Sequence, residues 1–289
     1  MRIALIGSNG QLGTDIMSCF KEKGEDVIGL TQDEIDVCYI DKCEPVILKI
    51  KPDLVINTAA FHKVDLCEDE GEAAFKVNAV GVKNLCDICL KLNIPLMHFS
   101  TDFVFGADKS RDKPYTEDDC PAPLSLYGIS KLAGEYVIKY NLKKYYLIRS
   151  CGLYGHAGSF GKGSNFVDLM IQRAEKGEKI RVVNDQILTP TSTKDLTEKL
   201  YELIHTGKYG LYHMTNTGQC SWYDFAVEIF KLAGLSPDIS PITSEEFAAK
   251  AKRPAYSVLD NKNLRAIGIK DMRPWQQALN DYINEKMDK

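Results

Sequence analysis

Short apolar runs alternate with longer stretches of helical period through the first half of the chain. In the longer stretches, which cover residues 12–23, 73–92 and 130–140, apolar residues recur at three- and four-residue spacings, as in helices packed on one face. The short runs read as strands at residues 3–6, 27–30, 54–57, 96–100 and 146–149. This alternation predicts right-handed βαβ units, and hence an α/β fold with a doubly wound parallel sheet covered by helices on both faces.

The pattern changes after Arg149. Residues 152–164 hold five glycines among polar and aromatic residues, which predicts a long loop. Shorter elements follow, with helices predicted at 165–176 and 222–233 and strands at 180–183 and 211–215. We therefore expect a first domain over residues 1–150, to which segments at about 180–220 return, and a smaller mixed C-terminal lobe made mainly of residues 151–289.

Composition excludes several classes of protein. The chain has 289 residues, of which 44% are hydrophobic and 26% charged, as in ordinary globular proteins. The net charge of −4 offers no basic surface for a phosphate backbone or an anionic membrane, so we expect no nucleic-acid or membrane partner. No apolar run approaches the roughly 18 residues of a membrane span, nor a signal-peptide core, and we expect a cytoplasmic protein.

Cysteine and histidine spacing favours neither disulfides nor a metal site. The nine cysteines are an odd number, scattered along the chain, which favours reduced thiols. Cys86 and Cys89 form a C-x-x-C pair, but they lie in a helical stretch without a second pair, so we interpret them as buried structural thiols. The five histidines show no ligand spacing, and the sequence predicts no metal.

A glycine-rich segment links the first predicted strand to the first predicted helix. Gly7, Gly10 and Gly13 stand in a G-x-x-G-x-x-G spacing rather than the commoner G-x-G-x-x-G. At such a junction glycines permit a tight turn, a close approach of backbone to a pyrophosphate and close helix–sheet packing, as in Rossmann-type folds. The helix N-terminus then offers unpaired N–H groups to the phosphates. A glycine turn without a cofactor is the alternative.

The end of the second predicted strand bears on the choice of nicotinamide cofactor. Thr31 and Gln32 stand where an acidic residue would bind the ribose 2′-hydroxyl of NAD. Since no carboxylate there repels a 2′-phosphate, NADP(H) is favoured and NAD(H) is the alternative. Asp36 and Val37 lie close enough to reach the adenine edge, although a capping aspartate explains Asp36 equally well.

A tyrosine and a lysine four residues apart are the sharpest local signal. Tyr127 and Lys131 fall on one face of a predicted helix, where the ammonium can lower the phenol pKa and make it a proton donor to a carbonyl oxygen. Thr101 stands at the C-terminal end of a predicted strand, where catalytic groups of open α/β sheets collect. Its hydroxyl can bind the same carbonyl oxygen, or it can cap the following loop.

In this order the motifs resemble the extended short-chain dehydrogenase/reductases, and within them the dTDP-4-dehydrorhamnose reductase family, nearly end to end. The matching landmarks are Gly7 to Gly13 with Gln11 and Leu12, Asn57 to Ala60 with Val64, Asp65 and Glu68, Val77-Asn78, Ser100 to Phe105, Pro114-Tyr115 with Glu117, Tyr127 to Glu135, Asn165-Phe166, Asp185-Gln186 with Pro190-Thr191, Gly210 to His213, and Arg253-Pro254 with Leu259-Asp260.

The resemblance implies reduction of the 4-keto group of a nucleotide-activated 6-deoxyhexose by NAD(P)H, with a nucleotide sugar as partner. It assigns Tyr127 as proton donor, Lys131 to the nicotinamide ribose and to lowering the tyrosine pKa, and Thr101 to the 4-keto oxygen. It further implies a cofactor site made of Gly7, Gly10, Gln11, Leu12, Gly13, Asp36, Val37, Ala59, Ala60, Tyr127 and Lys131. On the substrate side it places Asp102, Phe103, Asn165 and Arg253, the last as a phosphate contact or a surface ion pair. Some family members dimerise around a divalent ion near the position of Asp15, so a homodimer is compatible with the sequence.

Two departures from the family pattern bear on the sugar. Phe103 replaces a common tyrosine, and Gly152 stands where members often carry a tryptophan against the substrate. A 4,6-dehydratase is disfavoured because Phe103 occupies the position of the glutamate that such enzymes need. A 4-epimerase, another 4-ketoreductase, and a non-catalytic NADP-binding regulatory subunit remain as alternatives; retention of Thr101, Tyr127 and Lys131 favours an enzyme.

Overall fold

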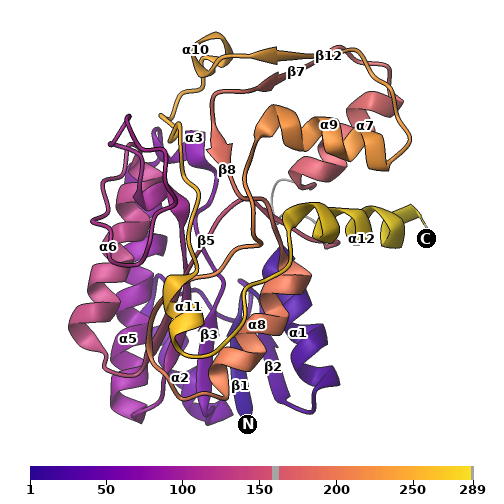
Figure 1. Cartoon of the computed structure of the whole chain (residues 1–289). Coiled ribbons are helices and arrows are strands. Elements are labelled where there is room, and N and C mark those ends of the chain that lie inside the picture. Colours follow the sequence, from indigo (N-terminus) through magenta and orange to yellow (C-terminus); the bar gives the residue numbers. More distant parts are fainter. Residues whose placement is uncertain (158–162, 288–289) are drawn as a thin grey trace.

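A parallel sheet organises the first half of the chain in the computed structural model, which describes residues 1–157 and 163–287. Within these residues its strands lie in the order β2-β1-β3-β4-β5-β10 (Figure 1). Their bounds are β1 Arg2–Ile6, β2 Asp26–Leu30, β3 Leu54–Asn57, β4 Leu96–Thr101, β5 Tyr145–Ser150 and β10 Gly210–His213. The strands predicted in the first half are confirmed, as is the doubly wound α/β class. Because β2 and β3 lie on opposite sides of β1, the strand order reverses there and opens a crevice at the carboxyl ends.

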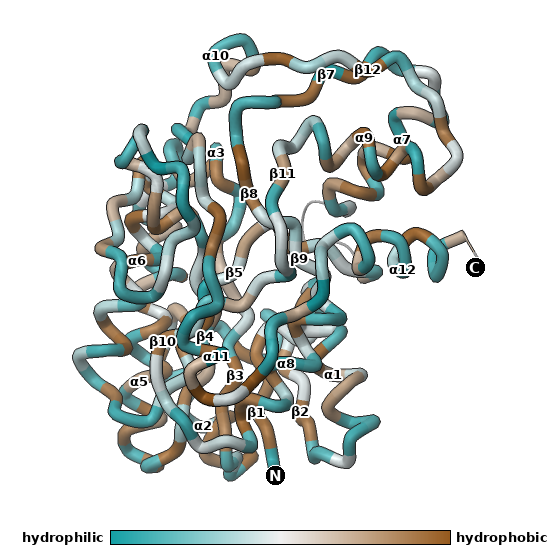
Figure 2. The backbone as a smooth tube through the Cα atoms, viewed as in Figure 1, coloured by the Kyte–Doolittle hydropathy of each residue, from teal (hydrophilic) through white to brown (hydrophobic). Residues whose placement is uncertain are grey.

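Alternating side chains of the strands build a core on each face of the sheet. Ile3 and Leu5 pack with α1 Gln11–Glu22 and α8 Thr193–Ile204, whereas Ala4 and Ile6 face the opposite layer. That layer consists of α2 Ile40–Ile50, α5 Gly81–Leu92 and α6 Leu126–Asn141. The short α11 Lys262–Ala266 covers β10. In Figure 2 the hydrophobic colour follows the central strands, between the two helical layers.

The helix predicted at 73–92 is interrupted. It consists of α4 Gly71–Phe75, a π-helical turn η1 Lys76–Val80 and then α5, and it follows the short α3 Val64–Cys67. The wider turn directs Asn78 towards the loop after β3, where its Oδ1 accepts from Phe61 N (2.9 Å) and its Nδ2 donates to Phe61 O (3.0 Å). Asn78 Nδ2 also donates to Ser130 Oγ on α6 (3.0 Å). The π turn therefore fixes a loop that borders the crevice.

A smaller lobe lies over the carboxyl ends of the strands (Figure 1). Its core packs α7 Phe166–Glu175, α9 Trp222–Leu232 and α12 Trp275–Met287 beneath β7 Ile180–Val183, which pairs in parallel with β12 Ile239–Ile242. The shorter elements are η2 Asp102–Val104, β6 Leu153–Tyr154, β8 Ile187–Leu188, β9 Thr191–Ser192, β11 Cys220–Ser221 and α10 Ser244–Phe247. Between β7 and α9 the chain returns to the first domain as α8 and β10.

The glycine-rich region predicted as one long loop has a different structure at its start. Residues 153–154 form β6, which pairs with β9, and residues 158–162 lie outside the described part. The nine cysteines are free thiols, and Cys86 and Cys89 are buried on α5. Over residues 1–157 and 163–287, no helix is both long and apolar enough to cross a bilayer.

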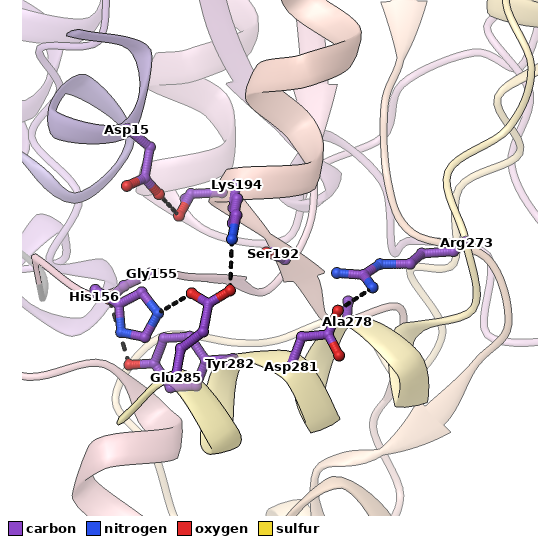
Figure 3. Close-up of a pocket in the computed structure, with 11 residues that line it drawn as sticks. Asp15, Gly155, His156, Ser192, Lys194, Arg273, Ala278, Asp281, Tyr282 and Glu285 are labelled. Carbon is purple, nitrogen blue, oxygen red and sulfur yellow. Dashed lines mark hydrogen bonds and ion pairs between the residues drawn. The ribbon is translucent and has the colours of Figure 1, made fainter. Parts of the chain in front are cut away.

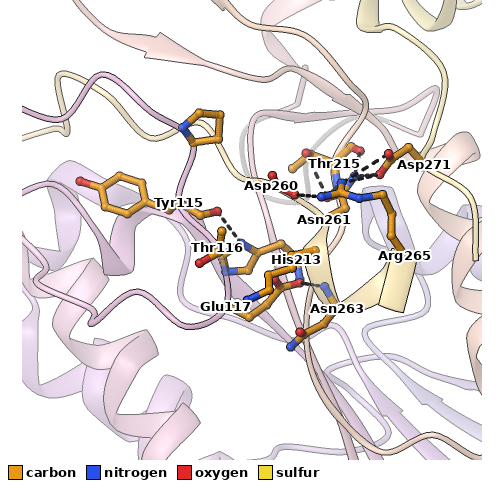
Figure 4. Close-up of polar contacts among 12 residues, drawn as sticks. Tyr115, Thr116, Glu117, His213, Thr215, Asp260, Asn261, Asn263, Arg265 and Asp271 are labelled. Carbon is orange, nitrogen blue, oxygen red and sulfur yellow. Dashed lines mark hydrogen bonds and ion pairs between the residues drawn. The ribbon is translucent and has the colours of Figure 1, made fainter. Parts of the chain in front are cut away.

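Polar contacts join three distant segments behind β10 (Figure 4). His213 Nδ1 donates to Tyr115 O (3.0 Å), while Glu117 Oε1 accepts from His213 N (2.8 Å) and from Asn263 N (3.1 Å). Burial, and next the charge of Arg149, lower the pKa of His213 to about 3, so the ring stays neutral. These contacts attach the 114–117 loop and the start of α11 to the edge of the main sheet.

Candidate active site

The described residues enclose a cavity of about 600 Å³ at the carboxyl ends of β1, β3 and β4. This volume lies in the range of roughly 300–1,000 Å³ typical of small-molecule sites. Most of the candidate site residues line it, namely Gly7, Gly10, Gln11, Leu12, Gly13, Asp36, Val37, Ala59, Ala60, Thr101, Asp102, Phe103, Tyr127, Lys131 and Arg253. The crevice beside β1, where the strand order reverses, therefore continues as one space to the start of α6.

The glycine turn brings the start of α1 against the strand ends. Gly7 has φ +78°, a conformation that glycine adopts without strain, and a Cβ there would lie 2.5 Å from Thr58 Oγ1. A Cβ on Gly13 would lie 2.1 Å from Gly7 O. The first N–H groups of α1 lack helical partners, and the first residues of the helix, Gln11, Leu12 and Gly13, line the cavity. Gln11 Oε1 is buried without a hydrogen-bond partner. These features fit a bound pyrophosphate.

We expect Gly13→Ala to destabilise the protein, because the methyl group and Gly7 O cannot both keep their places. Overpacking of this kind costs about 1–3 kcal/mol. Gly10→Ala is the matched control: its Cβ would lie 3.3 Å from the same oxygen, so its effect should be smaller. Urea denaturation of both variants checks the order. Equal stability of Gly13→Ala and the unchanged chain would contradict the close approach.

At the far end of the cavity, Asp36 and Val37 border the space together with Gln32. Asp36 Oδ1 accepts from Cys38 N (3.0 Å), so the aspartate caps its own loop and lines the cavity as well. Thr31 N and Oγ1 donate to Glu34 Oε2, at 2.8 and 3.0 Å. The carboxylate of Glu34 is therefore engaged with the end of β2.

Close packing brings Tyr127 to the end of β4. Ser125 Oγ accepts from Gly128 N (3.3 Å) and so caps α6. A Cβ on Gly128 would lie 2.3 Å from Phe103 O, so glycine permits the helix start to contact η2. The Phe103 and Tyr127 rings meet edge to face with centroids 5.7 Å apart. Thr101 Oγ1 accepts from Phe103 N (3.2 Å), which caps the loop, and it also lines the cavity.

Burial shifts the pKa values of Tyr127 and Lys131 in opposite directions. Burial raises the pKa of Tyr127, and a hydrogen bond with Thr101 opposes the shift only in part. Lys131, 2% exposed, has its pKa lowered to about 8 by burial, against the charge of Glu135. Its Nζ contacts His98 Nε2 at 3.3 Å. Desolvation therefore dominates the phenol, and the role of Lys131 in lowering the Tyr127 pKa stays a prediction.

Asp102 is buried beside the tyrosine. Its Oδ1 accepts from Thr101 Oγ1 (3.0 Å) and its Oδ2 from Cys151 Sγ (3.0 Å). Burial raises the pKa of Asp102, and hydrogen bonds from Cys151, Ser257 and Thr101 oppose this. The carboxyl group lines the cavity, so it is placed to meet a polar group of a ligand.

Two residues expected on the substrate side have other contacts. Asn165 does not line the cavity; its Oδ1 caps α7 at Asp168 N (3.0 Å) and its Nδ2 donates to Tyr282 Oη (2.8 Å). Arg253 lines the cavity and also forms an ion pair with Asp65 (2.8 Å), so the ion pair is present and the phosphate contact stays a prediction. An asparagine before an apolar helix is a common N-cap, and that signal was available for Asn165.

Residues to which the sequence assigned no contact with cofactor or substrate complete the cavity wall. Gly152, with φ +54°, lines it without a side chain, and Trp222 at the start of α9 lines it from the smaller lobe. Other wall residues are Phe61, His62, Val64, Val77, Phe99, Ser100, Ser150 and Leu153. Position 152 therefore contributes no aromatic side chain to the wall, whereas Trp222 contributes one from α9.

A small depression near Asp15 has a volume of about 10 Å³, close to that of a single water-sized probe (Figure 3). Asp15 accepts a hydrogen bond from Thr193, and Glu285 is paired with His156 (3.1 Å) and Lys194 (2.5 Å). In the part of the chain that the structure describes, no group of three or more histidine, cysteine or acidic side chains is suited to hold a metal ion.

The chain is similar to known proteins over nearly its whole length. The RmlD substrate binding domain family matches residues 1–287. The spore coat polysaccharide biosynthesis protein SpsK of Bacillus subtilis (strain 168) is 38% identical over 99% of this chain and 98% of its own. A dTDP-4-dehydrorhamnose reductase of Mycolicibacterium smegmatis is 36% identical over 98% of this chain and 85% of its own. The crystal structure of dTDP-4-dehydrorhamnose reductase from Bacillus anthracis in complex with NADP superposes with a TM-score of 0.93 at 37% identity, covering 98% of this chain and 99% of that one.

Proposed function

Because the chain belongs to the dTDP-4-dehydrorhamnose reductase family, we propose that it reduces dTDP-4-dehydro-L-rhamnose to dTDP-L-rhamnose with NAD(P)H. One observation carries this proposal. A single cavity joins the glycine turn at one end to Thr101, Tyr127 and Lys131 at the other. A cofactor and a sugar nucleotide can therefore meet in one space.

NADPH is the preferred reductant. Thr31 and Gln32 follow β2 at the positions where an acidic residue would bind the ribose 2′-hydroxyl of NAD. The nearby carboxylate of Glu34 accepts hydrogen bonds from Thr31 and does not line the cavity, which favours a cofactor with a 2′-phosphate. A relative that is 37% identical was crystallised with NADP, which agrees with this preference. NADH is the weaker alternative.

The reacting end supplies an acid and an orienting hydroxyl. The bound cofactor supplies the hydride that reduces C4 of the sugar. Tyr127 Oη donates a proton to the oxygen at C4. Thr101 Oγ1 turns its hydrogen from Asp102 Oδ1 to that oxygen and holds it beside the phenol. Lys131 binds the nicotinamide ribose, and as an ammonium it stabilises the phenolate that proton transfer leaves.

The substrate lies between the two lobes. Asp102 and Phe103 border the reacting end, and Trp222 offers an aromatic face from α9. Arg253, held by Asp65, presents a guanidinium to the diphosphate. The lack of a side chain at Gly152 and of a hydroxyl on Phe103 leaves a pocket that tolerates variation in the sugar.

Absorbance at 340 nm, followed with NADPH or NADH and dTDP-4-dehydro-L-rhamnose, tests the proposal directly. We expect oxidation with both cofactors and a higher kcat/KM with NADPH, together with formation of dTDP-L-rhamnose. Turnover of another 4-keto sugar nucleotide, but not of dTDP-4-dehydro-L-rhamnose, would show that the proposed substrate is wrong and the proposed reaction class right. Tight NADP(H) binding without turnover of any such sugar would contradict the enzymatic proposal and favour a regulatory subunit.

A further inference from the structure

A buried chain of hydrogen bonds connects the loop after β3 to Lys131. Asn57 at the end of β3 and His98 on β4 are register partners in the sheet, and each is 1% exposed. Asn57 Nδ2 lies 3.1 Å from His98 Nδ1, and His98 Nε2 lies 3.3 Å from Lys131 Nζ. Asn57 Oδ1 accepts from Ala59 N at 3.1 Å. Ala59 lines the cavity, so the chain has a cavity residue at each end.

The backbone N–H of Ala59 determines which group donates and which accepts in each of these hydrogen bonds. It is a donor only, so it fixes Asn57 with Oδ1 towards it and Nδ2 towards His98. Nδ1 of His98 must then accept. Burial lowers the pKa of His98 well below its usual value, so the ring is neutral and carries its single hydrogen on Nε2.

This assignment leaves Nε2–H pointing at Lys131 Nζ. An ammonium has three donors and no acceptor, whereas a neutral amine has a lone pair. All the hydrogen bonds from Ala59 to Lys131 can form together only when Lys131 is the neutral amine. When Lys131 is an ammonium, His98 loses its hydrogen bond either to Asn57 or to Lys131. A buried polar group without a hydrogen-bond partner costs free energy, so these hydrogen bonds disfavour the charged form of Lys131.

We propose that Asn57 and His98 are positioning residues that hold Lys131 at the cavity and set the pH at which its ammonium gives up a proton. Charged groups on the neighbouring elements act on the same site. Glu135 on α6 raises the pKa of Lys131, while Asp102 on η2 faces Tyr127. Neither belongs to the Asn57–His98 chain. The consequence for NADP(H) binding rests on the proposed function, whereas the ring tautomer does not.

Nuclear magnetic resonance of the ¹⁵N-labelled full chain at pH 9.5 tests the assignment without turnover. Long-range correlations within the imidazole should show His98 protonated on Nε2. His213 is an internal reference of the opposite kind, because its Nδ1 donates to Tyr115 O and its Nε2 faces Arg149 Nη1 at 3.3 Å. Protonation of His98 on Nδ1 at this pH would overturn the proposal.

Two variants should remove the preference for the neutral form of Lys131 in different ways. Asn57→Asp keeps an acceptor for Ala59 N but replaces Nδ2 with an oxygen, so His98 should turn to the Nδ1–H form and accept from the lysine ammonium. His98→Gln offers Lys131 an amide oxygen and adds no charge. Asn57→Asp alone also adds a negative charge, so the pair of variants separates tautomer selection from charge.

Titration of each protein with NADP⁺ between pH 7 and pH 10 gives the second readout. In the unchanged chain the dissociation constant should rise as pH increases through about 8, as Lys131 loses its proton. In both variants the rise should begin about one pH unit higher, which corresponds to about a tenfold change in proton affinity. A rise at the same pH in His98→Gln as in the unchanged chain would overturn the proposal. Absence of NADP⁺ binding at any pH would instead contradict the proposed function and leave the tautomer result standing.

Discussion

Tyr127→Phe is expected to lower turnover by about 10²- to 10⁴-fold while NADP(H) binding stays largely intact. The substitution removes the hydroxyl that would donate a proton at the end of the cavity, but it keeps the ring that packs edge to face on Phe103. Because burial raises the pKa of Tyr127, the phenol holds its proton at neutral pH and is an acid rather than a base. Single-turnover rates with saturating NADPH measure the loss.

Tyr115→Phe is the matched control for that loss. Its hydroxyl is also buried, lacks a hydrogen-bond partner and does not line the cavity, since the Tyr115 ring stacks on Phe105. Deleting it should leave kcat close to that of the unchanged chain. A Tyr127→Phe enzyme with full rate would mean that the proton comes from another group, such as the carboxyl of Asp102, which also lines the cavity.

The alternation of short apolar runs with stretches of helical period was sufficient to predict the strands of the first half and the helices α1, α5 and α6, but not α2 or α8. Burial on both faces explains why: Ile3 and Leu5 face one core, and Ala4 and Ile6 the other, so each run is continuously apolar. The order of the strands could not be predicted in the same way. Apolar patterning marks which residues form a strand but not which neighbour it takes, and β10 joins β5 from a distant part of the chain.

Local motifs likewise identified most residues around the cavity but not how each is used. Asn165 lies at a helix start, and its side chain caps α7 instead of facing the cavity. Trp222 opens an amphipathic helix and reads as a core residue, yet it also borders the cavity. The state of Lys131 depends on His98, which contacts it, and on Asn57, which contacts His98 because β3 and β4 are adjacent. Both residues lie far from Lys131 in sequence.

Beyond the cavity, a buried ion pair joins α6 to β5. Arg149 and Glu135 are 1% and 0% exposed, and two hydrogen bonds of 2.8 and 2.6 Å link them. Ser100 Oγ donates to Glu135 Oε1 at 2.6 Å, and the guanidinium lies 5.0 Å from the centre of the Phe105 ring. The pair therefore ties the helix that carries Tyr127 and Lys131 to the central strands.

Glu135→Gln should lower the free energy of unfolding by about 3–5 kcal/mol, because it leaves the Arg149 charge buried without a counterion. Urea denaturation measures this. Asp87→Asn is the control, since Lys83 and Asp87 form an equally close pair (2.5 Å) on the exposed face of α5, where solvent screens it; its effect should be small. Adding Arg149→Met to Glu135→Gln should recover much of the loss, because the unpaired charge is then gone. If Glu135→Gln proved as stable as the unchanged chain, another group would have to compensate the charge of Arg149. The Arg149–Glu135 pair would then not be what fixes α6 on the sheet.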